Sequence, residues 1–205
     1  LLAGGLVFVA DRTGTVQAFD SNGKPVWQQF TGGPVYYPPA VSGDRLFVGS
    51  ADGLVYALEA RTGRRLWTYR VAPNTERIAV YGKLIARHPV AGGVVHSGVL
   101  ADDGVVYAAA GIAHYDGTCV VALDAETGKL LAENTTSGQQ SAEVNSGVSM
   151  QGELAIVDGE LRFLGGGVYE VARYDLETLE CLNEPGKAVS SQYRTAFYPY
   201  YPSYG

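Results

Sequence analysis

A block of short strands and tight turns recurs along this chain, and that repetition constrains the fold more than any local pattern. The clearest copy is Arg45–Trp67, which reads RLFVGSADGLVYALEARTGRRLW. β-Branched and aromatic residues occur in both 46–48 and 54–58, as half-buried strands favour. Glycines such as Gly63 supply the positive φ of the turns. The block predicts an antiparallel meander that ends on a large aromatic side chain.

Three further copies follow the same order at a spacing of about 40 residues, at Leu6–Trp27, Gly104–Ala132 and Gly159–Leu182. Two of them depart from the pattern: the copy at 104–132 carries extra residues in its first turn and lacks the tryptophan, and the copy at 159–182 lacks the turn glycine. Ala132 stands where the first two copies carry tryptophan, and Leu179 stands where the others carry the turn glycine. In chain order, a short segment suited to an inner strand precedes the second, third and fourth copies. These segments are 37–42, 96–101 and 145–150.

Four strands in each repeat of this length are typical of a β-propeller blade. One small sheet cannot bury both of its faces, so blades must stack around an axis. We therefore predict an all-β fold: a partial β-propeller of four-stranded antiparallel blades, with about four blades, forming one domain over 1–205. The expected bounds are blade 1 at 1–31 with an incomplete inner strand, blade 2 at 35–70, blade 3 at 94–135, blade 4 at 144–184 and a Tyr/Pro-rich extended tail at 185–205.

The segment Ala57–Trp67 resembles the tryptophan-docking motif of PQQ-like (quinoprotein-type) β-propellers, Ala-x-Asp-x-x-Thr-Gly-x-x-x-Trp, with Glu59 in place of the Asp. Segments 122–132 and 18–27 match it in part. The resemblance implies about half of a seven- or eight-bladed propeller, in which the indole wedges between blades. It assigns structural blade-docking roles to Trp27, Trp67, Gly23, Thr62, Gly63, Asp124, Thr127 and Gly128. At Ala132 a neighbouring side chain should fill the gap, with the long loop at 73–93 as one source.

Whole-chain properties limit the class of partner. A net charge of −6 argues against nucleic acid as the main partner. No apolar run reaches the length of a transmembrane span, and no signal peptide is visible. Because the chain starts without Met, we expect a piece of a longer product, whose missing blades cover the end faces. Cys119 and Cys181 are expected to be unpaired, buried thiols.

Departures from the repeat are the places where binding groups are expected, because loops carry function on a rigid scaffold. The loop at 73–93 should contain a hairpin, with strands at 78–81 and 84–85. Candidate ligand-binding residues on the channel and the loop face are Tyr36, Tyr37, His96, Asn145, His114, Tyr115 and Asp116. Each has a structural alternative: the channel residues could satisfy water and backbone, and the Asp116 turn could be ordinary turn chemistry. Two close ligands are weak evidence for a metal, so neither a metal site nor a catalytic residue is predicted.

The resemblance leaves more than one function open, because fold does not fix function. The favoured hypothesis is a non-catalytic scaffold for protein or ligand binding within a larger exported bacterial protein, periplasmic or extracellular. This is the non-enzymatic branch, similar to outer-membrane assembly lipoprotein propellers, and no cofactor is expected for it. The first alternative is a fragment of a PQQ- and calcium-dependent dehydrogenase. Such enzymes hold the quinone between a Trp and a disulfide of adjacent cysteines, a pair that this sequence lacks. A carbohydrate-binding propeller, using the Tyr-rich tail and the His114 loop, is the second alternative.

Overall fold

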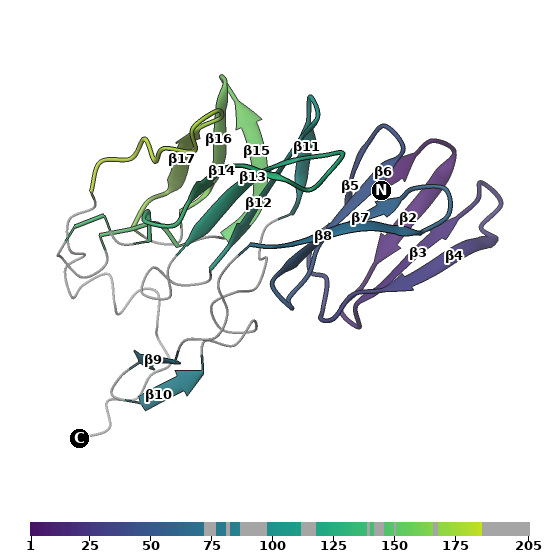
Figure 1. Ribbon diagram of the computed structural model, residues 1–205, viewed down its shortest axis with the longest axis horizontal. Helices are drawn as coiled ribbons and strands as arrows, with labels where there is room; N and C mark the ends of the chain where they lie inside the picture. Colours follow the sequence, from purple (N-terminus) through teal and green to yellow (C-terminus); the bar gives the residue numbers. More distant parts are fainter. Residues whose placement is uncertain are drawn as a thin grey trace.

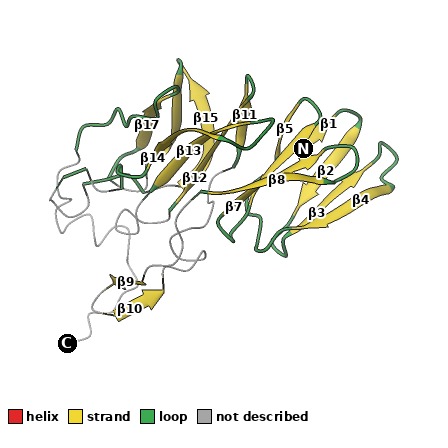
Figure 2. Cartoon of the chain, in the orientation of Figure 1, coloured by secondary structure: helices red, strands yellow, loops and turns green. Residues whose placement is uncertain are grey.

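Four antiparallel sheets follow one another in chain order in the computed structural model, with a separate two-stranded hairpin (Figure 1). The structure describes residues 1–71, 77–80, 83–86, 98–111, 118–138, 140–141, 146–149, 151–165 and 168–185. Strands and loops account for all of these residues (Figure 2). None of them forms a helix long and apolar enough to cross a membrane. The predicted all-β propeller class is confirmed.

Each sheet is a simple meander, in which every strand pairs with the strand next to it in the chain. Blade 1 contains β1 (Leu2–Ala3), β2 (Leu6–Ala10), β3 (Thr15–Phe19) and β4 (Pro25–Phe30). Blade 2 contains β5 (Ala40–Ser42), β6 (Arg45–Gly49), β7 (Leu54–Glu59) and β8 (Arg65–Arg70). Blade 3 contains β11 (Leu100–Asp102), β12 (Val105–Ala110), β13 (Cys119–Asp124) and β14 (Leu130–Asn134).

Blade 4 has three strands, β15 (Gln151–Val157), β16 (Glu160–Leu164) and β17 (Val171–Asp175). Its fourth strand is reduced to a single bridge between Tyr174 and Cys181. The long loop holds the hairpin of β9 (Arg77–Val80) and β10 (Lys83–Ala86), in which the two strands pair antiparallel. This pairing confirms the hairpin that the sequence predicts in the loop.

The hydrophobic core lies between successive blades, because alternate residues of a strand point to opposite faces of its sheet. In blade 2, Leu46 and Leu58 pack in a cluster with Phe8 of blade 1. Their neighbours Phe47 and Ala57 point the other way and pack with residues of blade 3. A third cluster joins blade 3 to blade 4. We call the surface that a blade turns to the following blade its forward face, and the opposite surface its back face.

The inner strands of blades 2, 3 and 4 all begin later than the sequence predicts. β5 starts at Ala40 rather than at 37, because Pro38 and Pro39 lack the N–H that a strand ladder requires. In blade 4 the inner strand is β15, at 151–157, and not the expected 145–150: residues 146–149 are described and are not a strand. In blade 3 the expected 96–101 becomes β11 at 100–102, and 96–97 lie outside the described residues.

Candidate functional site: blade contacts, channel and the blade 4 face

Trp27 of blade 1 lies on the turn of blade 2. Its indole Nε1 donates a hydrogen bond of 2.9 Å to the carbonyl of Ala60. The ring covers Gly63, whose φ is +72°, so closely that a Cβ there would lie 2.6 Å from Cδ2 of the indole. Only a residue without a side chain fits this turn beneath the ring.

The same contact recurs one blade further on. Trp67 Nε1 donates a 3.2 Å hydrogen bond to the carbonyl of Ala125, and the ring lies over Gly128, again at φ +72° and 2.6 Å. The sequence analysis names both residues of each contact, and their blade-docking role stays a prediction. Gly23, the third of these glycines, has φ +78° but no atom within 4 Å of a Cβ position. Its docking role stays a prediction.

Side chains of the acidic turn residues hold these turns in shape. Asp124 Oδ1 accepts hydrogen bonds from the hydroxyl and the backbone N–H of Thr127, at 2.6 and 2.7 Å. In blade 2, Glu59 replaces the aspartate and accepts a hydrogen bond from the hydroxyl of Thr62. These bonds favour the charged form, so the pKa of Asp124 and that of Glu59 lie below their ordinary values, mainly because of Thr127 and Thr62.

The blade 3–blade 4 contact has neither a tryptophan nor a turn glycine. Ala132 occupies the tryptophan position, and Leu179, at φ +56°, occupies the glycine position. Leu179 is fully buried, and Ala132 packs against the same cluster. Leu179 and Ala132 thus lie in one hydrophobic cluster, and the expectation that a neighbouring side chain fills the space at Ala132 stays a prediction. Leu179 comes from the turn of the following blade; the loop proposed as a source lies mostly outside the described residues.

The inner-strand ends of blades 2, 3 and 4 meet around Gly98. A Cβ at Gly98 would lie 3.7 Å from the Cβ of Tyr37 and 3.7 Å from Cγ of Glu153. Tyr37 is half-buried and Glu153 is exposed, so a phenol and a carboxylate flank this point. Sequence reasoning placed Tyr37 here and missed Glu153, because it put the inner strand of blade 4 too early in the chain.

Tyr36 lies beside a cationic side chain, Arg12, that the sequence analysis missed. The guanidinium carbon of Arg12, in the β2–β3 turn, is 5.8 Å from the centre of the Tyr36 ring, within cation–π range. The other candidates fall outside the described residues, namely His96, Asn145, His114, Tyr115 and Asp116. Their roles at the channel and the loop face stay predictions.

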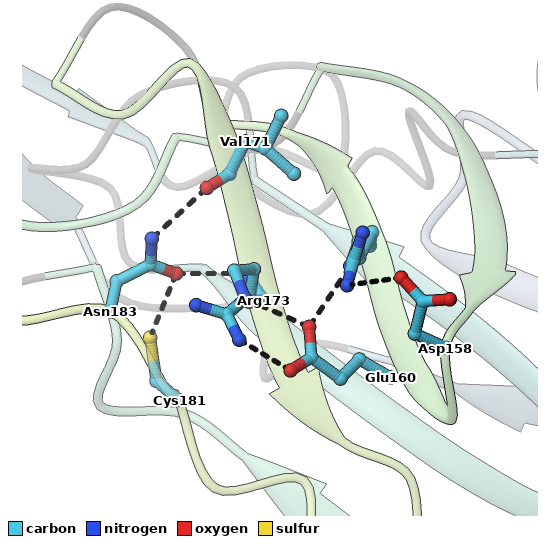
Figure 3. Close-up of polar contacts among 7 residues, drawn as sticks. Asp158, Glu160, Val171, Arg173, Cys181 and Asn183 are labelled. Carbon is cyan, nitrogen blue, oxygen red and sulfur yellow. Dashed lines mark hydrogen bonds and ion pairs between the residues drawn. The ribbon is translucent and has the colours of Figure 1, made fainter.

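The forward face of blade 4 carries charged side chains (Figure 3). The forward face of blade 2 carries apolar ones, such as Phe47 and Ala57. Arg162 and Arg173, which pair across β16 and β17, both bond the carboxylate of Glu160. Nε of Arg173 lies 2.8 Å and Nε of Arg162 lies 2.9 Å from Oε2 of Glu160. Arg162 also pairs with Asp158 at 3.2 Å. Asn183 donates its side-chain amide to the Val171 carbonyl and accepts the Arg173 backbone N–H.

The two arginines hold Glu160 in its charged form. Hydrogen bonds from Arg173, and then from Arg162, lower the pKa of Glu160 from its ordinary 4.5 to about 2. The charged carboxylate therefore stabilises the folded state at pH values above about 4.5. This contribution declines as the pH falls, because the unfolded chain takes up a proton first, and it is lost as the pH passes through about 2.

Replacing Glu160 by Gln is therefore expected to lower the free energy of unfolding at neutral pH, with a deficit that shrinks as the pH falls from about 4.5 to about 2. Urea unfolding at a series of pH values measures the difference between the two proteins. Glu177→Gln, at an exposed turn of the same blade, is the matched control and should show no such trend. A pH-independent deficit for Glu160→Gln would contradict the charge argument.

The described residues do not fit a quinone held between a tryptophan and a disulfide. Both tryptophans bond the turn of the next blade. Cys119 and Cys181 lie in different blades and are not adjacent in the chain, so they do not supply such a disulfide. Burial raises the pKa of the Cys181 thiol. Within the part of the chain that the structure describes, no group of three or more His, Cys, Asp or Glu side chains could hold a metal ion.

Comparison with known proteins decides the family. The model of a PQQ-type repeat family, described as outer membrane protein assembly factor BamB, matches residues 1–192. The chain belongs to this family. BamB from Nitrosomonas eutropha is 29% identical over 135 residues, which are 65% of this chain and 28% of that protein. The matched segment is thus less than a third of that BamB-family protein.

Members of a second group are also similar to this BamB-family chain. The quinohemoprotein alcohol dehydrogenase of Comamonas testosteroni is 30% identical over 143 residues, which are 69% of this chain and 18% of the enzyme.

Among solved structures, BamB from Moraxella catarrhalis superposes with a TM-score of 0.62 at 21% identity, covering 88% of this chain and 49% of that one. The structural likeness supports the fold alone.

Proposed function

We propose that this chain is part of a non-catalytic propeller scaffold in an exported bacterial protein, placed in the periplasm or outside the cell. Its partners would be another protein, or a ligand, together with further blades of the same polypeptide. The BamB family match over residues 1–192 supports this proposal. No cofactor enters it.

One observation carries the proposal: the aromatic side chains that a quinone site would use are engaged in structure. Trp27 and Trp67 each place the indole N–H on a carbonyl of the next blade and the ring on its glycine. A ring that already contacts protein on this face cannot also stack on a planar cofactor there. We propose on this basis that both tryptophans, with their turn residues, dock one blade onto the next.

Binding of PQQ tests the scaffold proposal directly. The chain is titrated with PQQ in the presence and absence of calcium, and bound quinone is measured by equilibrium dialysis with absorbance detection. We expect no saturable binding at stoichiometric concentrations. Tryptophan emission should fall only as much as light absorption by the free quinone explains. Tight one-to-one binding that requires calcium would overturn the scaffold proposal. The outcome would then favour the dehydrogenase alternative.

A fragment of a PQQ- and calcium-dependent dehydrogenase is the second candidate, favoured by the similarity to the Comamonas testosteroni enzyme over 143 residues. The carbohydrate-binding alternative depends on the His114 loop and the tail, which lie outside the described residues. A glycan array with Tyr115→Ala and Tyr200→Ala variants would test it. Unchanged binding in both variants would remove these residues from the hypothesis.

A further inference from the structure

The blade 3–blade 4 contact exchanges the sizes of the two side chains that meet in the other contacts. The turns themselves are the same: the backbone N–H of Gly128 bonds the Asp124 carbonyl at 2.8 Å, and that of Leu179 bonds the Asp175 carbonyl at 3.0 Å. Only the side chains differ. The large residue lies on the outer strand in blades 1 and 2, and on the turn of blade 4.

Leu179 occupies a backbone conformation that leucine disfavours. A positive φ is sterically unfavourable for an L-residue with a Cβ, and Leu179 lies at φ +56°. Such a residue persists when its surroundings stabilise it. Leu179 is fully buried in the cluster that includes Tyr107 and Val120 of blade 3. Burial of the leucine side chain therefore offsets the strain at this turn.

The hydrogen bond of the docking contact is exchanged as well. The indole nitrogens bond the carbonyls of Ala60 and Ala125, which directly follow the acidic turn residue. The equivalent carbonyl in blade 4 belongs to Leu176, and it accepts a hydrogen bond of 3.3 Å from the hydroxyl of Tyr107. Tyr107 lies on β12, at the position that Phe47 occupies in blade 2. A different residue on a different strand thus bonds the same backbone position.

We propose that the turn residue of each blade determines which blade can dock on its back face. A glycine turn accepts a blade that presents tryptophan. The Leu179 turn accepts a blade that presents alanine at that position and a tyrosine hydroxyl from the second strand. The back face of blade 4 is thus an interaction surface specific for blade 3. Leu179 excludes blades that carry tryptophan on the outer strand, as blades 1 and 2 do. The inference rests on the proposed docking role of Trp27 and Trp67.

A pair of exchanges tests this specificity in the intact chain. Ala132→Trp and Leu179→Gly are made singly and together, and the urea midpoint of unfolding is measured for each. Each single variant should unfold at lower urea, Ala132→Trp because the indole meets Leu179, and Leu179→Gly because a cavity forms. The double variant should recover at least half of the summed loss. The reverse exchange, Trp67→Ala with Gly128→Leu, should behave in the same way.

The matched control joins two variants from different contacts, Ala132→Trp with Gly128→Leu, and its losses should add without recovery. If Ala132→Trp does not fold, the milder exchange of Ala132→Leu with Leu179→Ala replaces it. If the losses in urea midpoint from Ala132→Trp and Leu179→Gly simply add in the double variant, the specificity proposal is overturned, even if Trp67→Ala is strongly destabilising. A neutral Trp67→Ala variant would instead overturn the docking role on which the proposal rests. The two failures are therefore distinguishable.

Discussion

Replacing Trp67 by alanine is expected to lower the free energy of unfolding by about 3 kcal/mol, the lower part of the range for removing a packed aromatic side chain. The indole packs on Phe47, with ring centres 5.7 Å apart, lies on Gly128 and bonds the Ala125 carbonyl. The side chain is half-buried, which places the loss below that of a fully enclosed ring. Urea unfolding followed by far-ultraviolet circular dichroism measures the change.

An exposed aromatic residue provides the control for this variant. Phe30, at the end of β4, has 65% of its surface exposed, and Phe30→Ala should change the free energy of unfolding by less than about 0.5 kcal/mol. If Trp67→Ala costs no more than Phe30→Ala, the indole does not hold blade 2 to blade 3. The contact would then be a consequence of stacking and not one of its causes.

Replacing Gly128 by alanine should be as damaging as removing the ring above it, with an expected loss of about 3 kcal/mol. Two costs combine: strain from a Cβ at φ +72° and overlap of that Cβ with the Trp67 indole, 2.6 Å away. The ring cannot move aside without breaking its hydrogen bond to Ala125. The same unfolding measurement applies.

Gly104 separates these two costs. Its φ of +77° matches that of Gly128, but a Cβ there would have no atom within 4 Å. Gly104→Ala should therefore show the strain alone, about 1 kcal/mol. Equal losses in the free energy of unfolding for Gly128→Ala and Gly104→Ala would mean that the Trp67 indole shifts to accommodate the added methyl group. In that case the glycine would be required for its backbone conformation and not for the closeness of the ring.

The repeat predicts the sheets well because it is a local signal. Strands at 46–48 and 54–58 were expected and lie within β6 and β7. The inner strands are predicted less accurately, because the expected segments include residues that precede the strand. In blade 4 the expected segment is 145–150, yet β15 begins only at Gln151.

The candidate sites were harder to predict, because they depend on which residues meet across blades. The loss of the turn glycine at Leu179 and of tryptophan at Ala132 is visible in the sequence. That the two positions lie in one hydrophobic cluster is visible only when blade 3 stacks on blade 4. The bonds of Arg162 and Arg173 to Glu160 likewise require the register of β16 against β17. Alternation of charge along 160–162 could have suggested them.

The charged forward face of blade 4 limits what can cover it. Back faces such as that of blade 3 present Val106 and Val121, which offer no hydrogen-bond acceptors. Laid over Arg162 and Arg173, such a face would dehydrate two guanidinium groups whose remaining N–H donors need partners, at a cost that the existing bonds to Glu160 do not recover. A covering surface must therefore bring its own oxygen atoms. Hydration and salt concentration should affect the stability of that contact more than they affect the apolar contacts between the other blades.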